Sequence, residues 1–199
     1  MFPATTFRRA AVLAAAAAAL GSAAELAAQP TTGRQPLSPR DTVRMELAGG
    51  HRISIDYGRP YRRGRKIMGE LVPFGRVWRT GANAATTLST DVDLRIGNAT
   101  VPRGTYTLYT LPTAGQWTLI VNRQTGQWGT QYDASRDLVR IPLQKRALER
   151  PVEQFTISLE PAQGGGTLVL TWENTRVSVP FRVVTGGHQH PPQPQRRGP

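Results

Sequence analysis

Apolar and polar residues alternate strictly in several short stretches of this chain, a pattern typical of β-strands with one face on a hydrophobic core. In the first stretch Ile53, Ile55 and Tyr57 alternate with polar neighbours. The same alternation recurs in five later stretches, at residues 105–110, 117–122, 155–159, 168–172 and 177–181. No stretch between residues 41 and 184 keeps a helical period, so the pattern predicts an all-β domain.

Residues that favour turns separate these predicted strands. Pro112–Gly115 predicts a hairpin turn, and Gly164–Gly166 and Glu173–Thr175 predict two more. Short strands separated by turns are typical of an antiparallel sandwich or an open barrel. We therefore expect a single antiparallel β-sandwich, or open barrel, from Asp41 to Val184.

Two segments lack the strand pattern. The longer one, Arg59–Thr86, is rich in Gly and Pro and is called the basic loop, because seven basic residues and one acid, Glu70, lie between Arg59 and Arg79. The second runs from Gly126 to Asp137. Long loops in compact domains are usually functional or mobile, so we expect binding residues in these two segments.

The first 28 residues have the order of a secretory signal peptide. Arg8 and Arg9 precede an apolar run from Ala10 to Leu20, and small residues follow. We expect cleavage after Ala24 or Ala28, with Ala28 favoured. Export through the Sec route is predicted, with the arginine pair as a hint of twin-arginine export. The alternative is an uncleaved N-terminal helix.

Composition extends this prediction of an exported protein. Residues 29–40 and 185–199 are rich in Pro, Gly, Gln and other polar residues, and predict a disordered leader and tail. The chain has no cysteine, which excludes an acylated N-terminal cysteine and leaves the core alone to stabilise the fold. We expect a periplasmic or secreted protein that is not a lipoprotein and has no transmembrane segment.

The formal charge is +12, falling to about +11 without residues 1–28. Only Lys66 and Lys145 are lysines among the 25 basic residues. An excess of arginine favours binding of phosphate or carboxylate groups, although codon bias in a GC-rich genome gives the same composition. No recognisable nucleic-acid-binding module accompanies the charge, so no specific nucleic-acid partner is expected.

Familiar catalytic and metal-binding patterns are absent from the sequence. It has no nucleophile elbow, no P-loop and no dinucleotide-binding fingerprint. His188 and His190 form a pair in the tail without a third ligand, so no metal or cofactor is expected. Asp91 and Asp93 would share one face of a strand, which we interpret as an exposed face rather than an acid–base pair.

Arg79 is one of the candidates for ligand binding. Beside Trp78, its guanidinium group can stack on an indole ring or clamp an anion. Thr80–Asn83 predicts a tight turn, with Asn83 or Gly81 left-handed, whose backbone N–H groups can form an anion-binding concavity. The alternative is structural: Arg79 would pair with a buried carboxylate, such as Asp56 or Asp137, and Asn83 would cap the turn.

The second irregular stretch adds aromatic candidates. Trp128 offers a ring to a sugar or a flat ligand, and the alternative is that it plugs one end of the sandwich. The complete set of candidate ligand-binding residues is Arg59, Arg65, Trp78, Arg79, Asn83, Thr86, Trp128 and Asp137. No residue is assigned a catalytic role.

Several motifs together resemble one known family. They are Tyr57–Pro60 (YGRP), Gly64–Gly69 (GRKIMG), Val77–Thr87 (VWRTGANAATT), Pro102–Pro112 (PRGTYTLYTLP), Trp117–Asn122, Trp128–Gly129 and Asp137–Arg140. Over residues 37–184 the chain resembles the bacterial domain-of-unknown-function 2911 family, to which the resemblance assigns no activity. The chain departs from the family pattern at Ala84, where the family usually has Glu, and at Met68, where it commonly has Phe. A catalytic or metal-binding role of that Glu would be missing from this chain.

Three hypotheses on function remain open. The first is a non-catalytic envelope protein whose basic loop binds a small anionic or carbohydrate-like ligand, or a partner protein. The second is a hydrolase with an unrecognised carboxylate and arginine site, for which Asp137 and Arg79 are the candidates. The third is a structural envelope module whose loop residues only stabilise the fold.

Overall fold

A computed structural model describes residues 38–184 of the chain. The predicted signal peptide, the tail with His188 and His190, and most of the predicted leader lie outside the described residues. The predicted leader ends slightly too late, because Arg40 already begins the first strand. No helix among the described residues is long and apolar enough to cross a membrane.

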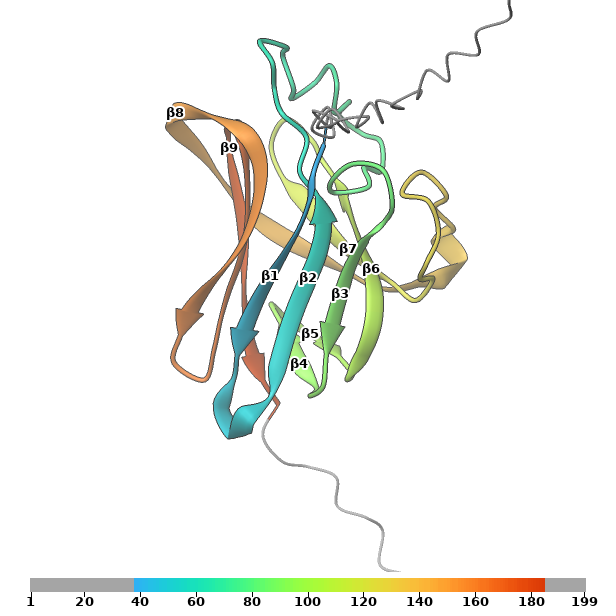
Figure 1. Cartoon of the computed structure of the whole chain (residues 1–199), viewed down its shortest axis with the longest axis vertical. Helices are drawn as coiled ribbons and strands as arrows, with labels where there is room; N and C mark the ends of the chain where they lie inside the picture. Colours follow the sequence, from blue (N-terminus) through green and yellow to red (C-terminus); the bar gives the residue numbers. More distant parts are fainter. Residues whose placement is uncertain (1–37, 185–199) are drawn as a thin grey trace, which may run out of the picture. The chain divides into compact units, whose positions relative to one another are not determined.

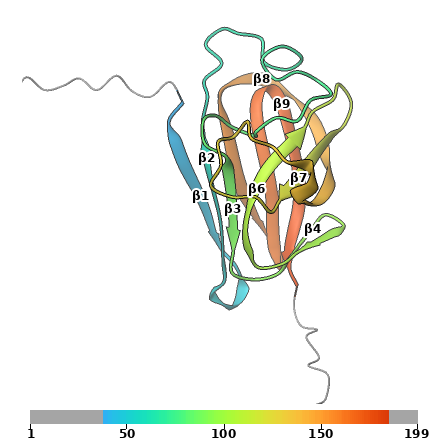
Figure 2. The same cartoon turned by 90° about the vertical axis from the view of Figure 1, so that its right-hand side faces the viewer.

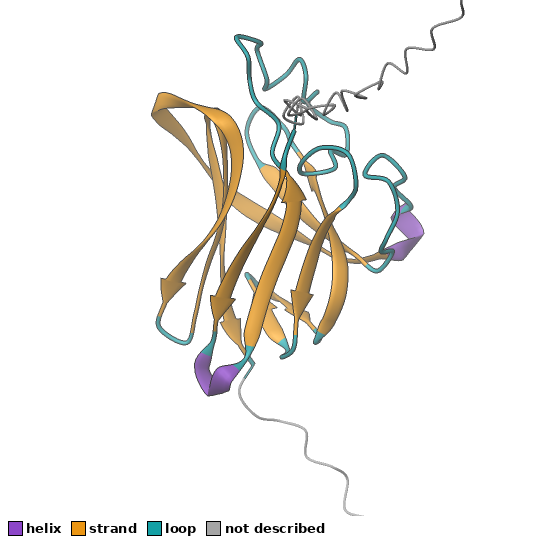
Figure 3. Ribbon diagram, viewed as in Figure 1, coloured by secondary structure: helices purple, strands orange, loops and turns teal. Residues whose placement is uncertain are grey.

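Nine antiparallel strands form one sheet in the order β1-β2-β3-β6-β7-β8-β9-β4-β5, which confirms the predicted all-β class (Figures 1 and 3). They are β1 (Arg40–Glu46), β2 (Arg52–Gly58), β3 (Thr86–Thr90), β4 (Leu94–Ile96), β5 (Ala99–Val101), β6 (Gly104–Leu111), β7 (Trp117–Asn122), β8 (Asp137–Ala162) and β9 (Gly165–Val183). The only helices in this part of the chain are two single 3₁₀ turns, η1 (Ala48–Gly50) and η2 (Ala134–Arg136).

The sheet folds over on itself through its longest strand, β8. β8 pairs with β7 over residues 137–143 and with β9 from residue 144 onward, and β9 then pairs with β4 at residues 181–183. β8 therefore belongs to both layers, and β9 lies in the layer that contains β4 and β5 (Figures 1 and 2). The sheet does not close, which agrees with a sandwich or open barrel.

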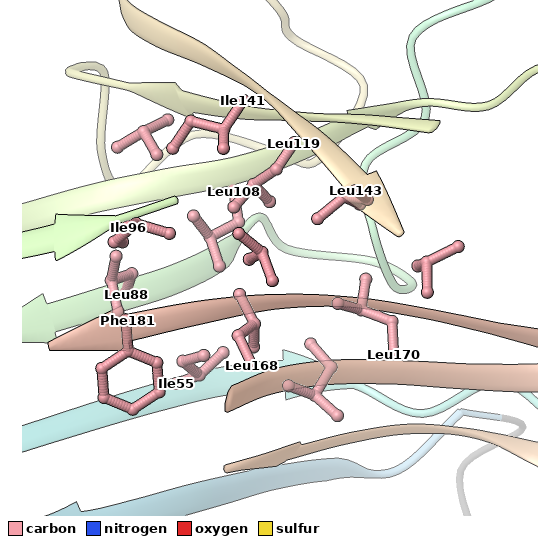
Figure 4. Close-up of a cluster of buried hydrophobic side chains, with 14 of the residues drawn as sticks. Ile55, Leu88, Ile96, Leu108, Leu119, Ile141, Leu143, Leu168, Leu170 and Phe181 are labelled. Atoms are coloured by element: carbon pink, nitrogen blue, oxygen red, sulfur yellow. The ribbon is translucent and has the colours of Figure 1, made fainter. Parts of the chain in front are cut away.

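One hydrophobic core lies between the layers (Figure 4). Its members come from the alternating positions: Ile53 and Ile55 point inward from β2, and Leu168 and Leu170 from β9. Burying a side chain of this size contributes about 1.5–3 kcal/mol relative to leaving it exposed. A core of this extent stabilises the domain without a disulfide, since the chain has no cysteine.

Tyr57 bridges the two layers where no backbone pair joins them. Its hydroxyl accepts a hydrogen bond from the Ile157 N–H at 3.0 Å and donates one to the Ile157 carbonyl at 3.3 Å. Its ring packs edge-on against Phe155 at 5.8 Å between centroids. Burial raises the pKa of Tyr57 above its ordinary value of 10.0, so the folded state favours the neutral phenol.

The structure corrects two sequence predictions. Glu173–Thr175 is not a turn: β9 continues through it, with a shift in register against β8 and a left-handed φ of 51° at Glu173. Asp91 and Asp93 are not on a strand either, since they lie in the connection between β3 and β4. The Asp91 carboxylate accepts a hydrogen bond from the Arg52 N–H at 2.9 Å, and the Asp93 carboxylate accepts one from the Arg103 N–H at 2.8 Å. Each carboxylate therefore binds a backbone N–H group.

Candidate functional site

The basic loop joins β2 to β3 at one end of the sheet and is bonded to the strands on either side of it (Figure 1). Near its start, the Phe155 N–H of β8 donates to the Pro60 carbonyl at 2.9 Å. Near its end, Trp78 exchanges two backbone hydrogen bonds with Thr110 of β6, at 2.7 and 2.9 Å. The loop therefore extends the sheet at both ends, although it has no strand of its own.

Glu173 holds the middle of the basic loop. Its carboxylate accepts the backbone N–H groups of Ile67 at 3.2 Å and Met68 at 3.0 Å, and the Arg62 guanidinium lies 3.8 Å away. The side chain is only 13% exposed. The sequence placed Glu173 in a turn and gave no sign of this role, which depends on a contact more than 100 residues distant in the chain.

The segment from Arg79 to Asn83 forms a strained turn. Thr80 and Asn83 have left-handed φ values of 52° and 64°. The sequence predicted this for Asn83 but not for Thr80, whose β-branched side chain disfavours it. Thr80 is fully buried, and its carbonyl accepts the Thr86 hydroxyl at 2.8 Å. Strain of this kind persists where surrounding contacts fix it, often at a binding site.

A cavity of about 560 Å³ lies between the basic loop and residues 129–132. Its volume is in the range of small-molecule sites. Its apolar wall includes Val72, Trp78, Tyr109, Tyr132 and Trp172. Its charged lining is Arg63, Arg65 and Arg79, and the described residues around it include no Asp or Glu. A wall with three cations and no carboxylate favours an anion.

The Arg79 guanidinium is open to a ligand. Its Nε donates to the Gly81 carbonyl at 3.3 Å, and no described carboxylate lies within 4.0 Å of it. The alternative pairing with Asp56 or Asp137 is therefore wrong: Asp56 pairs with Arg40, and Asp137 with Arg140.

Gly129 makes room for Arg79. A Cβ atom at this glycine would lie 2.7 Å from the Arg79 Cδ and 2.7 Å from the Asn83 carbonyl oxygen, distances that real Cβ atoms essentially never show. The Gly129 N–H also donates to that carbonyl at 2.9 Å. The absence of a side chain here lets the two loops meet and lets the Arg79 stem lie between them.

Four of the eight candidate residues line the cavity: Arg65, Trp78, Arg79 and Asn83. Arg65 also donates to the Tyr61 carbonyl at 2.7 Å, which fixes part of its guanidinium. Trp78 is half-buried and stacks on Trp172 at 5.9 Å between ring centroids. The structure therefore brings these four predicted residues together around one cavity.

The other four candidates lie elsewhere. Arg59 pairs with Asp41 at 3.0 Å and also donates to Thr156, so it joins the start of the loop to β1 and β8. Thr86 is buried and bonded to Thr80, and it begins β3 rather than ending the loop. Trp128 is 52% exposed and does not line the cavity; at that exposure it does not plug the sandwich.

Asp137 is held in a network beside the cavity. Its carboxylate accepts hydrogen bonds from Asn122 at 2.9 Å, Tyr132 at 2.7 Å and Arg140 at 3.0 Å. It is 13% exposed and is not part of the lining. Asp137 orients the Tyr132 ring, which does line the cavity, and so acts on the site through that tyrosine.

The pH dependence of stability tests this network. Burial, followed by the hydrogen bond to Asp137, raises the pKa of Tyr132 from 10.0 to about 12. The folded state thus favours the neutral phenol, so this stabilisation is complete below pH 10 and is lost as the pH rises toward 12. We expect Tyr132→Phe to lose stability less steeply than the parent over that window, measured by urea denaturation. Equal slopes for the two proteins would contradict the raised pKa.

Sequence reasoning missed several residues of the cavity wall. Tyr109 and Trp172 lie on strands that the alternation predicts, but that pattern assigns them only to a core or a face. Arg63 is one of seven basic residues in the loop, and nothing in the sequence distinguishes it from the others. The chain departs from the family pattern at Ala84 and Met68. Ala84 forms a backbone bridge to Trp128, and Met68 is half-buried and donates its N–H to the Glu173 carboxylate.

Comparison with known proteins agrees with the resemblance seen in the motifs. The model of one family, described as a protein of unknown function (DUF2911), matches residues 38–181. No curated protein and no solved structure matches the chain significantly. The match covers almost all of the described domain, and the chain belongs to the DUF2911 family.

Proposed function

We propose that this protein is an exported, non-catalytic binding protein that takes a small anionic ligand into the cavity beside the basic loop. The observation that carries the proposal is the charge of the cavity wall. The described residues that line it include three arginines and no Asp or Glu. A guanidinium group binds carboxylate and phosphate groups bidentately. Arg79 in particular has no carboxylate partner in the described part of the chain.

The chemical character of the wall supports binding rather than catalysis. The described lining contains no Asp, Glu, His or Lys, the side chains that most often transfer protons in active sites. The hydrolase hypothesis needs Asp137 in the cavity beside Arg79, and Asp137 is bonded outside it. The purely structural hypothesis needs Asn83 buried, and Asn83 is exposed at the cavity.

Export is proposed from the sequence of the first 28 residues. Their order of basic, apolar and small residues is that of a signal peptide. The absence of cysteine agrees with a periplasmic or secreted protein that carries no lipid anchor. Small anions and glycans of the cell envelope would then be accessible to the cavity.

Thermal melting against a panel of anions, sugars and divalent metals tests the proposal. A ligand that binds only the folded state adds about 2.7 kcal/mol of stability at a hundredfold excess over its Kd. We expect at least one anion of the panel to raise the Tm saturably at 0.15 M salt, where surface attraction is screened. The sugars and metals serve as the neutral and cationic comparisons.

Arg79→Gln and Arg76→Gln are a matched pair for that experiment. Both remove one charge from the basic loop, but Arg76 is exposed and does not line the cavity. We expect the anion-dependent rise in Tm to disappear in Arg79→Gln and to persist in Arg76→Gln. If both variants keep the rise, or both lose it, the ligand is not bound in this cavity.

A further inference from the structure

The charged groups on the cavity wall are all hydrogen-bond donors. The two tyrosine hydroxyls of the wall are already engaged: that of Tyr109 donates to the Gln131 carbonyl at 3.1 Å, and that of Tyr132 donates to Asp137 at 2.7 Å. Each also accepts a hydrogen bond, from Gln127 and Arg140 respectively. The charged side chains of the wall are all arginines, which only donate, while the side chains of Ser38, Asn83 and Thr130 can both donate and accept. Donors therefore outnumber acceptors on the wall, which favours a ligand rich in acceptor atoms over a neutral sugar.

Backbone groups add to the donors. Gly81, Ala82 and Asn83 all line the cavity, and their N–H groups donate to no acceptor within the described residues. They follow Arg79 in the strained turn that begins with left-handed Thr80. Successive free N–H groups in a turn of this kind make a concavity for an anion. Arg79 and these three N–H groups thus belong to one short segment of the cavity wall.

The rest of the wall is apolar and aromatic. The rings of Trp78 and Tyr132 are both partly accessible, while Trp172, Tyr109 and Val72 are nearly fully buried behind them. Trp78 is fixed by edge contacts with Trp117 at 6.3 Å and Phe155 at 5.0 Å between ring centroids. Rigid aromatic rings offer a flat apolar surface, on which another flat group packs at small cost in conformational entropy.

The size of the cavity excludes a bare inorganic anion as a good fit. A water molecule takes about 30 Å³ of liquid volume, so a small tetrahedral anion fills only a minor part of the 560 Å³ and leaves the aromatic wall in water. A ligand that uses both parts of the wall carries an anionic group at one end and a flat apolar body at the other.

We propose that the ligand is an oxyanion, a carboxylate or a phosphate, carried on a flat aromatic body. Its anionic group binds Arg79 and the N–H groups of Gly81–Asn83, and its ring packs on Trp78 and Tyr132. This inference rests on the proposed function and narrows it, since it places neutral glycans and simple inorganic anions among the poor ligands.

Isothermal titration calorimetry of the mature protein at 0.15 M salt, with five probes, tests this inference. The probes are 2-naphthyl phosphate, 2-naphthoate, 2-naphthol, inorganic phosphate and glucose. We expect at least one naphthyl anion to bind tenfold or more tightly than naphthol, phosphate and glucose. If inorganic phosphate binds as tightly as the naphthyl anions, the aromatic part of the inference fails while anion binding stands. If naphthol binds as tightly, the anionic part and the proposed function fail while aromatic packing stands, and if glucose binds as tightly, both parts fail.

Variants place the binding within the cavity. Arg79→Gln is expected to weaken the naphthyl anion to the level of naphthol, and Arg63→Gln to weaken it less. Arg63 is an exposed residue whose guanidinium lies 5.8 Å from the centroid of the Tyr61 ring, so its loss leaves the fold intact. Arg76→Gln should bind like the parent. The inference is overturned if no naphthyl anion binds, or if Arg76→Gln weakens binding as much as the two cavity variants do.

Discussion

Replacing Glu173 by Ala is expected to lower the free energy of unfolding by about 2–4 kcal/mol, because hydrogen bonds to a charged group contribute about 1.5–3 kcal/mol each. The carboxylate accepts the N–H groups of Ile67 and Met68. Ile67 is fully buried in the core, so neither water nor another side chain can readily replace the lost acceptor. Urea denaturation followed by circular dichroism measures the change.

Glu160→Ala is the matched control for this prediction. Glu160 is on β8 and makes a bidentate pair with Arg176 at 2.8 and 2.9 Å, but its side chain is 52% exposed. An exposed ion pair contributes about 0–1 kcal/mol, so the control should be close to the parent. Equal losses in the two variants would mean that Glu173 acts as one more surface charge and does not hold the basic loop.

Gly58→Ala is expected to destabilise the domain by at least about 2 kcal/mol, at the upper part of the range for overpacked sites. A Cβ atom at Gly58 would collide with the carbonyl oxygen of Ala82 and lie 2.9 Å from its carbonyl carbon. Both are backbone atoms of the cavity turn, which cannot move aside as a flexible side chain does. Any shift that relieves the collision displaces Ala82 from the cavity wall, so binding of an anion should weaken together with stability.

Gly115→Ala separates this effect from the loss of a glycine as such. Gly115 lies in the β6–β7 turn, and a Cβ atom there would meet nothing within 4 Å. Neither glycine has a left-handed φ, so the backbone tolerates alanine at both positions. Gly115→Ala should change the unfolding free energy by no more than about 0.5 kcal/mol. A comparably small change in Gly58→Ala would show that the loop yields at this contact.

The sequence predicts the strands well because burial on one face of a sheet leaves a direct trace in the alternation. Residues 53–57, 105–110 and 117–122 all fall on strands close to their predicted bounds. The first half of β8 and the short strands β4 and β5 leave a weaker trace. A three-residue strand spans too few positions to show a period, and half-exposed residues such as Leu138 and Val139 blur the pattern.

The sequence predicts the central residues of the cavity but not the contacts that they make. Arg79, Trp78 and Asn83 stand out because a tryptophan, an arginine and turn residues follow one another in a loop. Which carboxylate meets which arginine depends on the register of distant strands, and so the pairing of Arg79 with Asp137 was a wrong alternative. Glu173 is the clearest case, because its partners at Ile67 and Met68 are backbone atoms, which carry no mark in the sequence.

The strand that the two layers share, β8, has a consequence for how the domain unfolds. Because β8 pairs with β7 in one layer and with β9 in the other, neither layer can lose this strand while the other keeps all of its backbone pairs. The cavity wall takes part in the same unit, since Trp172 and Glu173 are on β9 and the basic loop is bonded to β8. We therefore expect the domain to unfold as one cooperative unit that includes the cavity wall.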